Sequence, residues 1–104
     1  MTSVCWLEDR DDRLARARVL AAEDPRAALA LVETVLAEVP DDRAALATKG
    51  AVLVDVADAE GDAVRARRLY AEALALLETQ GGDARDLEAA RRGYDATSAA
   101  RRTG

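Results

Sequence analysis

Few residues of this sequence could carry out catalysis. The chain has no histidine, one cysteine (Cys5) and only two serines, Ser3 and Ser98. Histidine is the usual general base at neutral pH, and a nucleophilic serine needs such a base beside it. The glycines do not cluster before a lysine or follow a strand pattern, as a phosphate-binding loop requires. We therefore expect a protein without enzymatic activity and without a cofactor.

Adjacent carboxylates are the other groups that could take part in catalysis or bind a metal ion. The pairs Asp11-Asp12 and Asp41-Asp42 both fall near expected helix starts. Negative charge at that end interacts favourably with the helix dipole, so we interpret the pairs as structural. Without histidine and with one cysteine, the chain can form neither a Cys/His metal site nor an intramolecular disulfide. We interpret Cys5, beside Trp6, as a partly buried apolar residue rather than a reactive thiol.

The charge of the chain narrows the classes of partner. The formal net charge is −5, which disfavours nucleic acid as the main ligand because binding it requires positive charge to neutralise phosphates. The densest basic patch, Arg65, Arg67 and Arg68, is interpreted as a solvated helix face paired with nearby Glu and Asp. There is no charged-then-apolar leader, and no apolar run is long enough to span a bilayer. We expect a soluble, cytoplasmic protein that contacts neither nucleic acid nor membrane.

The composition predicts helices. Of the 104 residues, 50% are hydrophobic and 34% are charged, which suffices for a core and a solvated surface. Alanine, the best helix former, is abundant, isoleucine is absent, and no segment shows the apolar–polar alternation of a strand. We predict an all-α fold in a single domain over residues 1–104.

Proline, glycine and aspartate divide the chain into five expected helices. The breaks are Asp24-Pro25, Pro40, Gly61-Asp62 and Gly81-Gly82. The expected helices cover residues 4–22, 25–39, 42–59, 63–80 and 84–101, and their short connections require antiparallel neighbours. The start of the first helix stays open. Ser3 is one candidate cap, but the polar stretch 8–13 also allows a start near Asp11 with Trp6 folded back.

The helix over residues 63–80 has the clearest amphipathic pattern. Its apolar residues recur at spacings of four, three and four, at Ala66, Tyr70, Ala73 and Leu77. They share one face, which neighbouring helices must cover. Asp62 is expected to cap the first turn, and Gly81 to end the helix in the left-handed conformation. In the helix over 42–59, Gly50 costs about 1 kcal/mol relative to alanine, so we expect a neighbour to approach closely there.

Residues 24–80 resemble the tetratricopeptide repeat. The second helix of that repeat carries a small residue, a large one four positions later and a small one three further on, as Ala66, Tyr70 and Ala73 do here. The Gly61-Asp62 turn precedes this motif at the family spacing. An earlier unit has the residues Ala28, Val32 and Val35, followed by Pro40-Asp41-Asp42.

The resemblance implies stacked antiparallel hairpins, an α-solenoid with a right-handed superhelix in which the helix over 84–101 is a cap. Two features depart from the family pattern. Ala28 and Ala66 are 38 residues apart, whereas the usual period is about 34. The difference is about one helical turn, so we expect the third helix to be one turn longer. No unit carries the large aromatic residue of the repeat's first helix.

The resemblance also implies a function. In such repeats the first helix of each unit lines a concave surface that binds a protein or peptide, so we expect a non-catalytic adaptor or scaffold. The expected partner-binding residues are Arg10, Arg13, Ala17, Ala47, Ala51, Val54, Asp55 and Arg91. Some family members use Lys and Asn to hold a C-terminal carboxylate where this chain has Ala47 and Ala51, so we do not expect that clamp.

Two alternatives stay open. In the first, the first or last helix covers the alanines, and they form no groove. In the second, the chain is a regulatory or sensory domain that binds a small ligand between its helices, or that self-associates as a homodimer through an exposed alanine and valine strip. Self-association is a reasonable alternative because two repeats are few for a stable array.

Overall fold

The computed structural model describes residues 2–103, with side chains described for residues 6–98. All regular structure in this part of the chain is helical and no strand occurs in it, so the all-α prediction is confirmed. The helices are α1 (Thr2–Leu20), α2 (Pro25–Glu38), α3 (Arg43–Ala59), α4 (Ala63–Gln80) and α5 (Ala84–Thr103). Each bound lies within two residues of the expected one.

The first helix is continuous. α1 runs from Thr2 to Leu20 without a break, so the late start near Asp11 was wrong. Two arginines in the polar stretch find carboxylates on other elements, which removes the need for an apolar residue at those positions. Trp6 stays on the helix and packs against the core. The side chains of Ser3 and Cys5 lie outside the described residues.

Aspartate caps begin the helices as the sequence predicts. The carboxylates of Asp24, Asp42 and Asp62 accept hydrogen bonds from first-turn backbone N–H groups, at 3.1, 2.9 and 2.9 Å. Each such cap stabilises its helix by about 1 kcal/mol. Gly81 has a φ of 74°, the left-handed conformation that ends α4. Both predictions for the ends of α4 are therefore confirmed.

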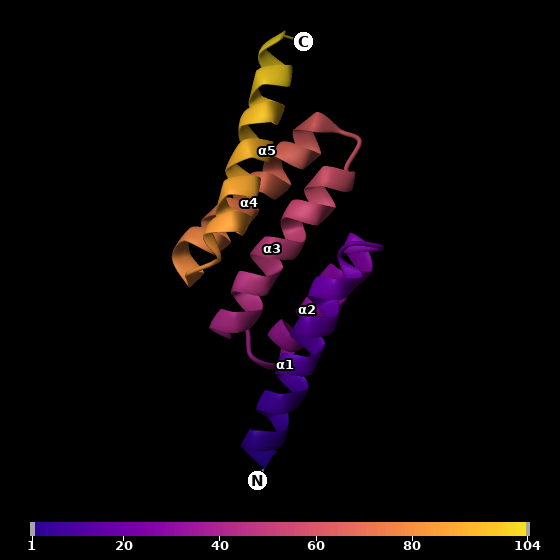
Figure 1. Cartoon of the computed structure of the whole chain (residues 1–104), viewed down its shortest axis with the longest axis vertical. Coiled ribbons are helices and arrows are strands. Elements are labelled where there is room, and N and C mark those ends of the chain that lie inside the picture. The colour runs from indigo at the N-terminus through magenta and orange to yellow at the C-terminus, as the bar shows by residue number, and fades with distance from the viewer. Residues whose placement is uncertain (1, 104) are drawn as a thin grey trace.

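α3 lies at the centre of the molecule. Its backbone lies beside those of all four other helices, whereas no Cα atom of α2 lies within 8 Å of a Cα atom of α4. Figure 1 shows α3 between the α1–α2 pair and the α4–α5 pair, with the N- and C-termini at opposite ends. The chain is elongated, with extents of 57 × 25 × 21 Å.

Two hydrophobic cores flank α3. The first core joins α1, α2 and α3 through Leu14, Ala17, Ala28, Val32, Val35, Ala45, Val52 and Val56. The second core joins α3, α4 and α5 through Leu53, Val54, Ala57, Ala66, Tyr70, Ala73, Leu77 and Ala90. All four residues expected on the inner face of α4 are buried. α3 is buried on two sides because it contributes to both cores.

Two glycines allow close packing in the second core. A methyl group on Gly50 would lie 2.9 Å from the Leu77 Cγ atom, so the predicted close approach to the third helix is confirmed. A methyl group on Gly93 would overlap the ring of Tyr70. Gly93 was not singled out in the sequence, although it lets α5 cross directly over the largest side chain of this core.

Candidate interaction surface

One strip of α3 stays accessible between the two cores. Ala47, Ala51, Asp55 and Asp58 follow at spacings of four, four and three, so they share one side of the helix. The first three are half-buried and Asp58 is exposed. We call these four residues the α3 strip. On the opposite side of α3, Lys49 bridges Glu33 of α2 and Glu72 of α4, with N–O distances of 3.1 and 3.6 Å.

Val54 does not belong to the strip. It is 6% exposed and packs in the second core. The sequence placed it beside Ala51, but Val54 is covered in the core that joins α3 to α4 and α5. Its prediction as a partner-binding residue was therefore wrong, whereas Ala47, Ala51 and Asp55 are brought together as expected.

The three residues predicted on α1 are engaged within the chain. Ala17 is 0% exposed in the first core and offers no surface. Arg13 donates to Thr34 at 3.1 Å and pairs with Glu38 at 2.6 Å, so it faces α2. These residues therefore offer no free surface beside the strip, because the period of α1 does not tell which of its sides stays open to solvent.

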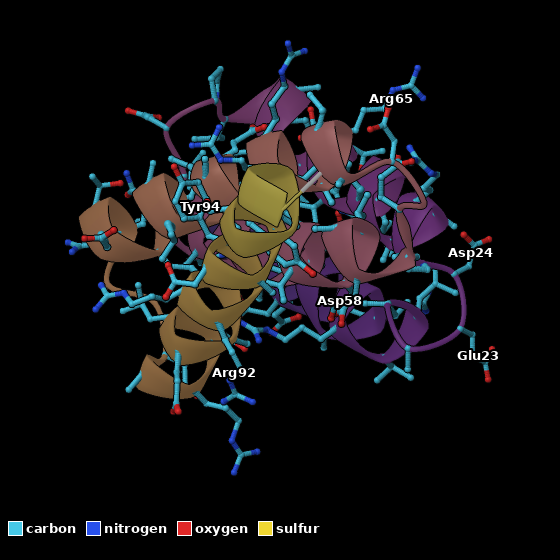
Figure 2. The ribbon with its side chains drawn as sticks, turned by 90° about the horizontal axis from the view of Figure 1, so that it is seen from above. Glu23, Asp24, Asp58, Arg65, Arg92 and Tyr94 are labelled. Carbon is cyan, nitrogen blue, oxygen red and sulfur yellow. The ribbon has the colours of Figure 1, made fainter. Side chains whose placement is uncertain are left out.

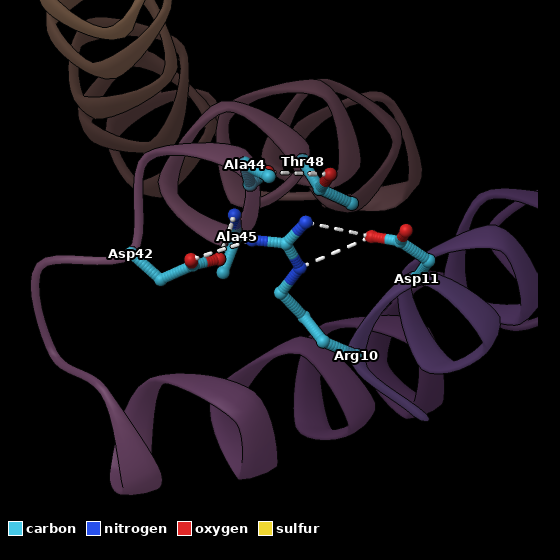
Figure 3. A network of polar contacts seen from close by, with 6 residues as sticks. All are labelled: Arg10, Asp11, Asp42, Ala44, Ala45 and Thr48. Carbon is cyan, nitrogen blue, oxygen red and sulfur yellow. Dashed lines mark hydrogen bonds and ion pairs between the residues drawn. The ribbon is translucent and has the colours of Figure 1, made fainter. Parts of the chain in front are cut away.

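Arg10 is likewise structural. Its guanidinium lies 2.9 Å from the Asp42 carboxylate and 2.8 Å from that of Asp11 (Figure 3). It also stacks over the Trp6 ring at 5.7 Å from the centroid. The second oxygen of Asp42 accepts from the Ala45 N–H at 2.9 Å. Arg10 therefore joins α1 to the first turn of α3 and is withdrawn from the predicted binding surface.

Acidic residues gather at the end of the strip. Asp55 lies near both Asp58 and Asp86 of α5, and the Asp86 carboxylate is 3.8 Å from Arg18 of α1. Burial raises the pKa of the Asp55 carboxyl, and the negative charges of Asp58 and Asp86 raise it further. Asp58 accepts a hydrogen bond from the Tyr70 hydroxyl. Burial, that hydrogen bond and the Asp58 charge raise the pKa of Tyr70 to about 12.

Arg91 lies away from this surface. Asp86, Ala90 and Gly93 follow at spacings of four and three and mark the side of α5 that faces α3 and α4. Arg91 is about 140° around the helix from Asp86, and its side chain is exposed. Sequence reasoning missed Asp86 and Arg18. Asp86 could have been found from the sequence, because it lies four residues before the inward-facing Ala90. Arg18 could not, because its contact with Asp86 depends on how α1 and α5 are arranged in space.

The described residues carry neither a membrane-spanning helix nor a cluster of metal ligands. None of their helices is long and apolar enough to cross a bilayer, and their His, Cys, Asp and Glu side chains form no group of three that could hold a metal ion. The chain matches no protein-family model, no curated protein and no solved structure. The resemblance to the tetratricopeptide repeat therefore depends on the motif residues alone.

Proposed function

We propose that this chain is a non-catalytic interaction domain that binds a segment of a partner protein along the α3 strip. The proposal includes its assignment as a tetratricopeptide-like domain. Close backbone approach of α3 to both α1 and α5, without such an approach between α2 and α4, supports a stacked-hairpin arrangement. A single cysteine suits a reducing compartment, so we place the domain in the cytoplasm.

The shape of the strip favours a helix as the bound segment. Ala47 and Ala51 have the smallest side chains that still present an apolar surface, and they are half-buried between neighbouring helices. A helix laid along them can bring its backbone close to α3, as amphipathic helices do in apolar grooves. The area is small, so affinity must also come from the charged end.

The acidic end of the α3 strip, formed by Asp55 and Asp58 with Asp86 of α5 nearby, favours a basic partner. This acidic group is the observation on which the proposal mainly rests. The half-buried Asp55 carboxylate lies close enough to Asp58 and Asp86 for both to repel its charge, and Arg18 forms the single ion pair made with these three residues in the described part of the chain. Desolvation and like charge disfavour ionised Asp55. A Lys or Arg of the partner would relieve that repulsion. The net charge of −5 likewise disfavours nucleic acid as the partner.

Selection from a library of displayed helical peptides tests this function. The wild-type domain should enrich peptides with a basic residue one or two turns from a small apolar stripe, and their binding should weaken as salt increases. Ala51→Arg should abolish enrichment by filling the strip and adding like charge. Ala75→Arg is the matched control, because Ala75 is exposed on α4. Unchanged enrichment by Ala51→Arg would contradict the proposal.

A second candidate function is self-association through α1 and α2. Ala15, Val19, Leu20 and Leu31 line an open apolar hollow of about 510 Å³, and Val19 is 77% exposed. A second copy of the chain would bury this surface. Sedimentation should then show a dimer that Val19→Asp dissociates and Val64→Asp, at another exposed valine, leaves intact. A wild-type monomer at high concentration would exclude this candidate.

A further inference from the structure

A cavity on the α4–α5 hairpin has a composition opposite to that of the α3 strip. It is lined by Val64, Arg67, Arg68 and Ala71 of α4 and by Tyr94 of α5, and its volume is about 320 Å³. The four α4 residues follow at spacings of three, one and three, so they form one face of that helix. In the view of Figure 2, the labelled residues Tyr94 and Asp58 lie on opposite sides of α5.

Arg67 is held in place by neutral groups. Its Nη2 atom donates to the Tyr94 hydroxyl at 3.0 Å, and its Nε atom donates to the Ser98 hydroxyl at 3.3 Å. The guanidinium also lies 5.1 Å from the centroid of the Tyr94 ring. These contacts fix the orientation of the group and leave its charge uncompensated. The Nη1 end remains able to donate to a ligand.

The pairing expected for this basic patch occurs at one of its three arginines. Arg65 lies 3.8 Å from Asp62. Among the described side chains, no carboxylate lies within 4.0 Å of the Arg67 or Arg68 guanidinium. Of the other arginines whose side chains are described, all but Arg43, Arg85 and Arg91 have such a partner, as Arg26 does in Glu60 at 3.0 Å. Two uncompensated guanidinium groups therefore line one cavity.

We propose that this cavity binds a phosphate monoester with an apolar stem. A phosphate monoester is close to a dianion at neutral pH, and two guanidinium groups match its charge, whereas a carboxylate would leave one of them uncompensated. The planar donors of arginine fit the oxygens of phosphate in a bidentate manner. Val64, Ala71 and the ring of Tyr94 provide apolar contacts for the organic group that carries the phosphate.

Phenyl phosphate is a suitable probe because it combines both features. We would titrate it into the full chain and follow the arginine Nε–Hε resonances by NMR, with inorganic phosphate and benzoate in parallel. Saturable shifts at Arg67 and Arg68 are expected, with phenyl phosphate binding more tightly than either comparison compound. Arg68→Gln should weaken binding by about tenfold, the loss expected for a charge-assisted contact. Arg68 makes no described polar contact within the chain, so this variant should fold normally.

Arg91→Gln is the matched control, because it removes the same charge from an exposed site and should bind like the wild type. Arg67→Gln should also weaken binding, and its circular dichroism spectrum shows whether the fold is retained. Equal affinity for benzoate and phenyl phosphate would contradict the proposal that the two arginines recognise the double negative charge of the phosphate. Shifts that spread over all arginines without saturating, or equal binding by Arg68→Gln and the wild type, would overturn the site itself.

Discussion

Gly93 and Tyr70 show how one absent side chain positions a helix. Tyr70 is the largest residue of the second core, and its ring occupies the space that a methyl group on Gly93 would need. Glycine within a helix costs about 1 kcal/mol relative to alanine. The chain tolerates this cost in α5 because α5 can then lie directly on the ring.

Gly93→Ala should therefore destabilise the protein despite the better helix propensity of alanine. Overpacking of a filled core costs roughly 1–3 kcal/mol, which exceeds the gain in propensity. Chemical denaturation of both proteins measures the difference in the free energy of unfolding. Gly61→Ala is the control, because no atom lies within 4 Å of the added methyl group and its effect should be small. A stabilised Gly93→Ala variant would show that α5 does not pack on Tyr70 as described.

In the α3 strip, the ionised form of the Asp55 side chain is unfavourable in the folded protein. Its folded-state pKa is raised, first by burial and then by Asp58 and Asp86, so folding favours the protonated form. The resulting stabilisation is complete below the unfolded pKa of this carboxyl. It is lost as pH rises through the folded pKa, and ionised Asp55 then opposes folding.

Asp55→Asn should consequently stabilise the protein at pH 7, by about 0.5 kcal/mol, because it removes a partly desolvated charge and its repulsion from Asp58 and Asp86 while solvent screening keeps the effect small. The advantage should disappear in acid, once the wild-type carboxyl is protonated in both states. Thermal unfolding of the two proteins at several pH values measures this difference. Asp95→Asn removes an equal charge from an exposed position on α5 and serves as the comparison. A destabilised Asp55→Asn variant at pH 7 would mean that Asp55 has a cationic partner.

Among the helices, α3 has an N-cap residue, Asp42, that also forms an ion pair with another helix. Asp42 caps the helix through the Ala45 N–H and also pairs with Arg10, which belongs to α1. Its side chain is 10% exposed, so water screens this ion pair less than those on the surface. Asp24 also caps a helix through the Ala27 N–H, and it forms no described ion pair.

Asp42→Ala should therefore cost more than Asp24→Ala. Loss of a cap costs about 1 kcal/mol, and loss of a charge-assisted hydrogen bond adds about 1.5–3 kcal/mol. Equilibrium unfolding of the two single variants gives the comparison. If both substitutions cost the same, the contact between Arg10 and Asp42 contributes nothing to stability.

Helix positions were predictable from the sequence, because the signals for them are local. Asp24-Pro25, Asp62 and Gly81 act on the backbone within a turn of their own position, and each fulfils its expected role. The start of α1 could not be decided because Arg10 and Arg13 depend on Asp42 and Glu38, which are distant in the sequence. A polar stretch in a helix is interpretable only when its tertiary partners are known.

At the scale of the whole molecule, the candidate surface was only partly predictable. Ala47, Ala51 and Asp55 follow from the period of one helix. The residues that α1 and α5 contribute depend on how those helices are rotated about their axes, which amphipathic patterns define only within a broad stripe. For this reason Arg13 and Arg91 were misplaced while Arg18 and Asp86 were missed.

The position of α3 also determines how the molecule should unfold. The end units of a stacked helical array can unfold separately from the rest when each unit has its own hydrophobic core. Here Val52 and Leu53 are adjacent in α3 but belong to different cores, so neither core can form without that helix. We infer that the two halves unfold together.

Leu53→Ala should test this coupling, because it damages the second core alone. Removal of a buried leucine side chain costs about 2–5 kcal/mol. Trp6 is the single tryptophan and packs against the first core, so its fluorescence reports on the undamaged half. We expect the fluorescence transition to shift to lower denaturant as far as the helical circular dichroism transition does. A fluorescence transition that kept its wild-type midpoint while half of the helical signal was lost would show that the two cores unfold independently.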